Sequence, residues 1–135
     1  MNPSDATISN VLRQEKHITV VGLSPRPERP SHSVTAYMIR QGYAVVGVRP
    51  GVTEILERPC YPSLLEVPEP IGILNVFRAT RFIPDIVEQA LQRGVRILWL
   101  QEGITHGPAE QRARDAGMQV VSNKCILKEY NRLLR

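Results

Sequence analysis

Cysteine and long apolar runs are both scarce in this sequence. Only two cysteines, Cys60 and Cys125, occur in 135 residues, too few for the disulfide framework that stabilises small secreted domains. No apolar run approaches the ~20 residues that a membrane-spanning helix needs. The first ten residues, MNPSDATISN, lack the basic and apolar regions of a signal peptide. The sequence therefore predicts a cytoplasmic protein that has no membrane partner.

Aromatic residues are also few, and this argues against binding to nucleic acid. Lys and Arg number 17 against 13 Asp and Glu, so the net charge of +4 permits an anionic partner. The basic residues are nevertheless scattered, aromatics make up only 5% of the chain, and no DNA- or RNA-binding motif occurs. We therefore expect a mildly basic surface and no nucleic-acid partner.

Motifs for catalysis and for metal binding are absent as well. The three histidines show no metal-ligand spacing with the cysteines. There is no G-x-S-x-G elbow, and no Ser–His–Asp or Cys–His arrangement can be argued from the order of the residues. Cys125 is expected at a helix start, a position that can activate a thiol, but a buried structural role is the favoured interpretation of both cysteines. The sequence thus predicts no catalytic residue and no metal.

The chain does contain five apolar segments that alternate with helical patterns. Strands are expected at residues 18–23, 43–48, 71–77, 95–100 and 118–121, a leading helix within residues 1–16, and further helices between and after the strands. A short helical piece is expected at 52–56 and a proline-rich connection at 59–70. Right-handed crossovers between such strands give a parallel sheet with helices on both faces. We predict one Rossmann-like, doubly wound α/β domain over residues 1–135, with a five-stranded, mainly parallel sheet.

A sheet of this kind binds ligands at the carboxyl ends of its strands, near the point where the strand order reverses. The first loop at that edge lies in the segment VVGLSPRPERPS, which ends at Ser31. It has only Gly22 where a dinucleotide-binding loop needs the pattern G-x-G-x-x-G. The second strand ends in Arg49 instead of the Asp or Glu that binds a free ribose hydroxyl. NAD is therefore disfavoured, and a cation at this position suits a phosphate on the ribose.

The same loop has features of an anion site. The helix expected to start at Ser31 or Ser33 offers unpaired N–H groups and the positive end of its dipole, and the prolines restrict the shape of the loop. A stiff surface turn with solvated arginines and a serine helix cap is the alternative, and this loop alone does not decide between the two. The side chains that could converge on one rim are Ser24, Ser31, Ser33, Arg26, Arg29, Arg49, Arg78 and Lys124.

The residues also resemble a known family. The motifs VVGLSPRPERPS, GYAVVGVRPG, CYPSL, NVFR, WLQEG, AGMQVV and KCILKE occur in the order found in the small CoA-binding proteins of bacteria, over about residues 17–130. Those proteins are single Rossmann-like domains. They are similar to the N-terminal CoA-binding domain of the succinyl-CoA synthetase alpha subunit and of ADP-forming acyl-CoA synthetases.

The resemblance implies that coenzyme A lies across the strand ends. It implies a phosphate region at Gly22, Ser24, Arg29 and Ser31, and a nucleotide beside Val48, Arg49 and Pro50. It implies a pantetheine side flanked by Phe77 and Arg78, and a far edge closed by Gln101, Glu102 and Gly103.

The resemblance further implies a binding role for this chain. The synthetases carry their phosphohistidine and nucleoside triphosphate on further domains, so we expect these 135 residues to bind CoA or an acyl-CoA without catalysis. Two alternatives stay open: an NAD(P)-binding regulatory module, and an enzyme in which Cys125 reacts with a CoA thioester or disulfide. A homo-oligomer is compatible with the sequence, which does not set the number of subunits.

Overall fold

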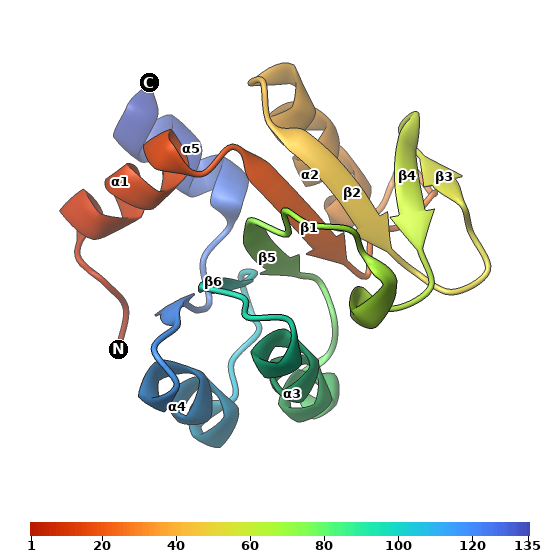
Figure 1. The fold of residues 1–135 in the computed structure, drawn as a ribbon. Helices are drawn as coiled ribbons and strands as arrows, with labels where there is room; N and C mark the ends of the chain where they lie inside the picture. The colour runs from red at the N-terminus through yellow and green to blue at the C-terminus, as the bar shows by residue number, and fades with distance from the viewer.

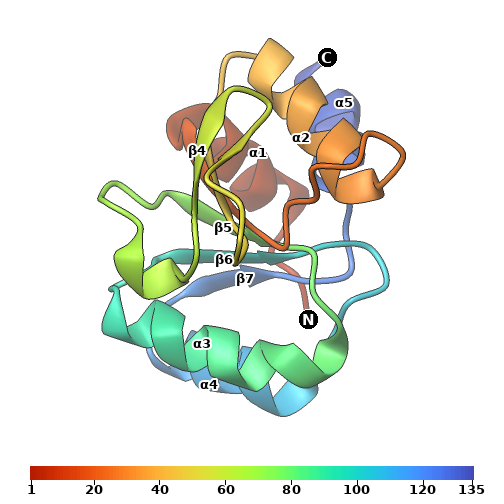
Figure 2. The same ribbon diagram turned by 90° about the vertical axis from the view of Figure 1, so that its right-hand side faces the viewer.

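The computed structural model describes residues 1–135 and has three layers, a sheet between two groups of helices (Figure 1). The strands are β1 (His17–Val21), β2 (Ala44–Val48), β3 (Glu54–Ile55), β4 (Arg58–Tyr61), β5 (Ile73–Val76), β6 (Ile97–Leu100) and β7 (Gln119–Val121). The helices are α1 (Asp5–Gln14), α2 (Pro30–Arg40), α3 (Ile83–Gln92), α4 (Gly107–Asp115) and α5 (Ile126–Leu134). Figure 2 shows α1, α2 and α5 on one side of the sheet and α3 and α4 on the other. All of these helices are too short or too polar to traverse a lipid bilayer.

The strands are ordered β3-β4-β2-β1-β5-β6-β7, and every neighbouring pair is parallel except β3 with β4. The chain runs outward from β1 through β2 to the hairpin, then crosses to β5 on the opposite side of β1. The strand order therefore reverses at β1, and the carboxyl ends of β2, β1 and β5 lie side by side: Val21 is in register with both Val48 and Val76. This α/β arrangement is consistent with a Rossmann-like domain.

The prediction of five strands was wrong, because the sheet has seven. The two additional strands, β3 and β4, form a hairpin. Strand β3 lies where a short helical piece had been predicted, and β4 lies mostly in the predicted proline-rich connection. The turn between them is made by Leu56 and Glu57, which both have positive φ values of 55° and 59°. Two-residue hairpin turns with positive φ values usually contain Asn or Gly, and neither occurs here. Pro59 in β4 also argued against a strand from sequence alone.

Apolar residues fill both faces of the sheet. On one face, Ile18 and Val20 of β1 belong to a cluster with Leu12 of α1, Met38 of α2 and Ile126 of α5. On the other face, Leu74 and Val76 of β5 belong to a cluster with residues of α3 and α4 such as Val87 and Ala113. Because the central strands are covered on both sides, their sequences are mostly apolar, and the polar Thr19 and Asn75 within them are buried as well. This packing on both faces fixes the positions of the carboxyl ends of the central strands.

The starts of the first two helices follow different rules. Ser4 caps α1, since its Oγ accepts a hydrogen bond from the Thr7 N–H at 3.2 Å, and this agrees with the expected leading helix. Helix α2 begins at Pro30, before the expected Ser31 or Ser33, and Arg29 at its N-cap makes no side-chain cap bond. Proline favours the first helical position because its φ is already helical and its missing N–H costs nothing there.

Candidate functional site

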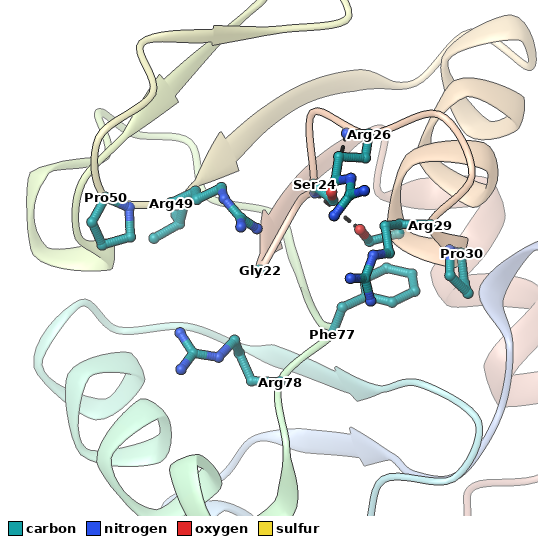
Figure 3. Close-up of a pocket in the computed structure, with 11 residues that line it drawn as sticks. Gly22, Ser24, Arg26, Arg29, Pro30, Arg49, Pro50, Phe77 and Arg78 are labelled. Atoms are coloured by element: carbon teal, nitrogen blue, oxygen red, sulfur yellow. Dashed lines mark hydrogen bonds between the residues drawn. The ribbon is translucent and has the colours of Figure 1, made fainter.

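A cleft of about 590 Å³ opens at the carboxyl ends of β1, β2 and β5, where the strand order reverses (Figure 3). Three separate segments build it: the loop and helix start after β1, the residues after β2, and the residues after β5. Its lining consists of Gly22, Ser24, Arg26, Arg29, Pro30, Ser31, Val48, Arg49, Pro50, Phe77 and Arg78.

The charge of this lining is entirely positive, with four arginines and no carboxylate. Arg26 is paired with Glu28, at 3.0 Å between Nε and Oε2. The other three form no ion pair within the chain. Arg29 is exposed, Arg49 makes only a 3.4 Å contact from Nη1 to the Leu23 oxygen, and Arg78 lies 3.9 Å from the centre of the Phe82 ring. The cleft therefore carries cations that a bound anion can neutralise.

Gly22 allows the three segments to meet at the floor of the cleft. Its φ is +85°, its N–H donates to the Val48 oxygen at 3.0 Å, and a Cβ atom here would lie 2.6 Å from the Phe77 oxygen. Real Cβ atoms essentially never approach a backbone atom that closely. Glycine is thus required by the close approach of β1 and β5, with or without a phosphate.

Two buried serines shape the loop and keep donors free. The Ser31 Oγ accepts from the Ser24 N–H at 2.9 Å, and the Ser24 Oγ accepts from the Arg26 N–H at 3.1 Å (dashed in Figure 3). A hydroxyl also has a hydrogen to donate, and neither of these hydroxyls donates to an acceptor of the chain. Both side chains line the cleft, so each can give a hydrogen bond to a ligand there.

The amino end of α2 faces the same cleft through Pro30 and Ser31. No side chain caps its first turn, so the positive end of the helix dipole is not offset by a capping oxygen. This adds to the charge of the arginines.

A second hollow, of about 430 Å³, shares Pro30, Phe77 and Arg78 with the cleft and extends it past β6. Most of its surface is apolar. Its remaining lining residues are Val34, Ala79, Gln101, Glu102, Ile104 and Cys125. The two hollows together form a path from a cationic end to an apolar end.

Hydrogen bonds that involve side chains hold the loop after β6 at three successive residues. The Gln101 Nε2 donates to the buried Asn75 Oδ1 at 2.5 Å, and the Gly103 N–H donates to the Asn123 Oδ1 at 2.6 Å. Glu102 accepts from the Lys128 ammonium at 2.9 Å, and that hydrogen bond is the main reason why the pKa of Lys128 is raised.

Most of the residues singled out in the sequence gather at these two hollows. The predicted phosphate, nucleotide and pantetheine residues line the cleft, namely Gly22, Ser24, Arg29, Ser31, Val48, Arg49, Pro50, Phe77 and Arg78. Gln101 and Glu102 line the second hollow.

Three predicted residues line neither hollow. Gly103 has its N–H committed to Asn123. Ser33 is exposed and donates to the Pro30 oxygen at 3.3 Å. Lys124 does not join the arginines as expected, because its ammonium lies 3.9 Å from the buried Glu129 carboxylate. Its side chain is thereby drawn toward α5.

The apolar part of the second hollow was missed by the sequence analysis. Val34, Ala79 and Ile104 come from three segments whose mutual packing no local pattern reveals. Cys60 is buried, as expected. Cys125 is only partly buried and lines the hollow, so its expected burial was wrong. It packs against one of the core clusters, and its structural role stays a prediction.

Comparison with known proteins yields a consistent group of relatives. The chain matches the family model of the CoA binding domain over residues 16–131. It is 38% identical to the uncharacterized protein YneT of Bacillus subtilis (strain 168) over 125 residues, which make up 93% of each chain.

The chain is also similar to part of a larger protein and to a solved structure. The chain is 25% identical over 96 residues to acetate–CoA ligase [ADP-forming] II of Archaeoglobus fulgidus, a match that spans 68% of this chain but only 14% of the ligase. A solved structure of a hypothetical protein from Pyrococcus horikoshii OT3 superposes with a TM-score of 0.94 at 36% identity, covering 98% of this chain and 94% of that one.

Proposed function

This chain belongs to the family of CoA binding domains, and from that premise we propose that its cleft binds coenzyme A or an acyl-CoA without catalysing a reaction. One observation carries the proposal: Arg29, Arg49 and Arg78 line a single cleft that contains no carboxylate. CoA has a pyrophosphate and a 3′-phosphate, and hydrogen bonds from arginine to phosphate are among the strongest that proteins form.

In this proposal the pyrophosphate lies over the loop after β1. Gly22 lets the backbone come close, the free hydroxyl hydrogens of Ser24 and Ser31 donate to phosphate oxygens, and Arg29 adds charge. The nucleotide lies beside Val48, Arg49 and Pro50, where the Arg49 guanidinium meets the phosphate on the ribose. The chain leaves the hydroxyl hydrogens of Ser24 and Ser31 without acceptors and gives the Arg49 guanidinium a single 3.4 Å contact. A ligand would complete these open hydrogen bonds, which supports the assignment.

The uncharged arm of CoA follows the path into the second hollow. Phe77 and Arg78 border both hollows, so the pantetheine passes between them. Gln101 and Glu102 close the far edge. We assign Gly103 an indirect part, since its bond to Asn123 holds the loop that carries them.

An NAD(P)-binding regulatory module is the second candidate. A phosphate on the ribose of NADP would also suit Arg49. The single Gly22 argues against it, because a dinucleotide pyrophosphate needs the additional glycines of the fingerprint for close backbone approach. The apolar second hollow also fits a pantetheine arm better than a nicotinamide ribose.

Isothermal titration calorimetry with CoA, NADP and NAD tests the choice of ligand. We expect CoA to bind most tightly and NAD most weakly, since NAD has no phosphate on its ribose for Arg49. Native mass spectrometry of the purified protein gives an independent view through any ligand that remains bound. Tighter binding of NAD than of CoA would overturn the proposal.

A further inference from the structure

Cys125 is held in a defined place at the end of the second hollow. The loop before it is fixed by hydrogen bonds from the Trp99 Nε1 to the Lys124 oxygen at 2.7 Å and from the Lys124 N–H to the Leu100 oxygen at 3.3 Å. Asn123 adopts a φ of 57° and holds the neighbouring Gly103. The backbone that leads into Cys125 is therefore held at the ends of β6 and β7, and Cys125 lines the hollow and is partly exposed.

The same hollow contains a buried amide with an open end. Gln101 is 3% exposed and its Nε2 bonds to Asn75, but its Oε1 accepts no hydrogen bond from the chain. The one fully buried side-chain oxygen without a partner is Thr35 Oγ1, so Gln101 Oε1 stays accessible and can accept a hydrogen bond from a ligand N–H group. The amides of a pantetheine arm provide such groups next to a terminal thiol. Within one hollow, Gln101 thus offers an acceptor for an amide N–H group of the pantetheine arm, and Cys125 offers a partner for its terminal thiol.

Cys125 lies beside two sources of positive charge. Cys125 is the N-cap of α5, a helix of nine residues, so it sits at the positive end of the dipole. The raised pKa of the Lys128 ammonium is due chiefly to its hydrogen bond with Glu102, and the charge of Cys125 adds to it. The ammonium and the sulfur are therefore close enough to interact. A thiolate, not a thiol, is the species that attacks a disulfide.

We propose that Cys125 forms a mixed disulfide with CoA by exchange with CoA disulfide, the symmetrical oxidised form of CoA. The Cys125 thiolate attacks one sulfur of the bound disulfide, the S–S bond of the ligand breaks, and a bond forms between Sγ and that sulfur. The other half leaves as CoA thiolate and takes up the proton that Cys125 had released. This inference rests on the proposed function, because the cleft has to deliver the sulfur of the ligand to the hollow.

Cys60 serves as an internal reference for this chemistry. It is buried at 6% exposure, and burial raises the pKa of its thiol. It lines neither the cleft nor the second hollow. Reaction at Cys60 would therefore require the strand pair β2–β4 to open, whereas reaction at Cys125 requires only that the ligand bind.

The experiment is to incubate the reduced protein with CoA disulfide and to follow its intact mass under non-reducing conditions. We expect one CoA per chain, located on Cys125 by peptide mapping, removed by dithiothreitol, and absent from Cys60. Cys125→Ser should form no adduct. Without any substitution, bound reduced CoA should also protect Cys125 of the parent protein from iodoacetamide.

Two comparisons show whether the cleft directs the reaction. Glutathione disulfide at the same concentration should react more slowly by a factor on the order of ten or more, because a bound ligand meets the thiol at a raised effective concentration. With CoA disulfide below saturation, Arg29→Ala should slow formation of the adduct by the same factor by which it weakens the binding of reduced CoA. Equal rates with the two disulfides would mean a merely accessible thiol and would overturn the inference.

Calorimetry with reduced CoA under reducing conditions distinguishes a failure of the exchange from a failure of the proposed function. If the parent protein binds CoA but CoA disulfide leaves Cys125 unmodified, the exchange is refuted and the proposed function stands. If the parent does not bind CoA at all, both are refuted. Modification of Cys60 at the same rate as Cys125 would also refute the exchange.

Discussion

Arg49 has separate tasks for its backbone and its side chain. Its N–H donates to the Tyr61 oxygen at 2.8 Å, which extends the pairing of β2 with β4. Its guanidinium makes a single long contact, at 3.4 Å, and belongs to the half-buried wall of the cleft. A substitution of the side chain therefore leaves the strand pairing in place. Arg29, which is exposed and unpaired, is equally dispensable for the fold.

We expect Arg29→Ala and Arg49→Ala each to cost about 1.5–3 kcal/mol of CoA affinity, the usual range for hydrogen bonds to charged groups. Arg49→Ala should weaken CoA more than dephospho-CoA, which lacks the 3′-phosphate, whereas Arg29→Ala should weaken both alike. Calorimetry measures the affinities, and a thermal melt should show little change in stability. Arg96→Ala is the control, because Arg96 directly precedes β6 at the end of the strand opposite the cleft. Wild-type affinity in both cleft variants would mean that the loop is only a stiff turn.

The close approach at Gly22 can be separated from its backbone conformation by a matched pair of alanines. Gly51 has nearly the same φ, +81° against +85°, but has no atom within 4 Å of an added Cβ. Gly51→Ala should cost about 1–2 kcal/mol of unfolding free energy from the positive φ alone. Gly22→Ala should cost roughly 1–3 kcal/mol more, the range for forced overpacking. Urea denaturation compares the two, and equal losses would show that the Phe77 oxygen moves aside freely.

At the scale of elements, the β3–β4 hairpin marks where sequence patterns stop being informative. Val52, Ile55 and Leu56 have the spacing of an apolar helix face, yet Ile55 is buried as part of a two-residue strand. Strands this short show no alternation, and their turn uses Leu56 and Glu57 in a conformation that these residues rarely adopt. The hairpin forms because β4 pairs with β2 and extends the sheet, a non-local cause.

The turn of this hairpin should gain stability from glycine. Glu57 is exposed and has a φ of 59°, so Glu57→Gly should relieve the strain and raise the unfolding free energy by about 0.5–1 kcal/mol. Glu54→Gly, at an exposed strand position with no positive φ, should lower it instead. Chemical denaturation checks both signs. Destabilisation by Glu57→Gly would show that its side chain contributes more than its backbone conformation costs.

Helix α1 is tied to the start of β2 by Tyr43, whose hydroxyl donates to the Leu12 oxygen. Burial raises the pKa of Tyr43 to about 12. Because this pKa is higher in the folded than in the unfolded state, the stabilisation is complete below about pH 10 and is lost as the pH rises toward 12. The loss should be on the order of 2 kcal/mol.

Tyr43→Phe isolates this effect. At neutral pH the variant should be less stable by about 1 kcal/mol, the net value of one hydrogen bond. Between pH 10 and 12 it should lose less stability than the parent, because the titrating group is gone. Denaturation curves across this range test the difference, and parallel losses in the two proteins would contradict it.

At the scale of the whole molecule, the parallel arrangement of the five predicted strands and the edge of the sheet that carries the candidate site followed from the sequence. Alternating apolar segments imply parallel strands, and parallel strands imply a site where their order reverses, which is where Arg29, Arg49 and Arg78 meet. Distances between side chains of different loops did not follow. Whether a cation such as Lys124 turns toward the cleft or toward Glu129 depends on the packing of α5. The second hollow depends likewise on how α2, β6 and α5 assemble.

The contact between Arg132 and Asp5, at 2.8 Å, has a consequence for the connectivity of the chain. It brings the start of α1 beside the end of α5, and Figure 1 shows both helices away from the hairpin. A flexible linker of roughly ten residues can therefore join residues 135 and 1. New termini opened at the exposed Gly42, whose surroundings are empty, lie at the edge opposite the cleft. Such a circular permutant should fold and bind CoA like the parent. Circular dichroism and calorimetry would measure this, and an unfolded permutant would mean that the α2–β2 turn has to form before the rest of the sheet.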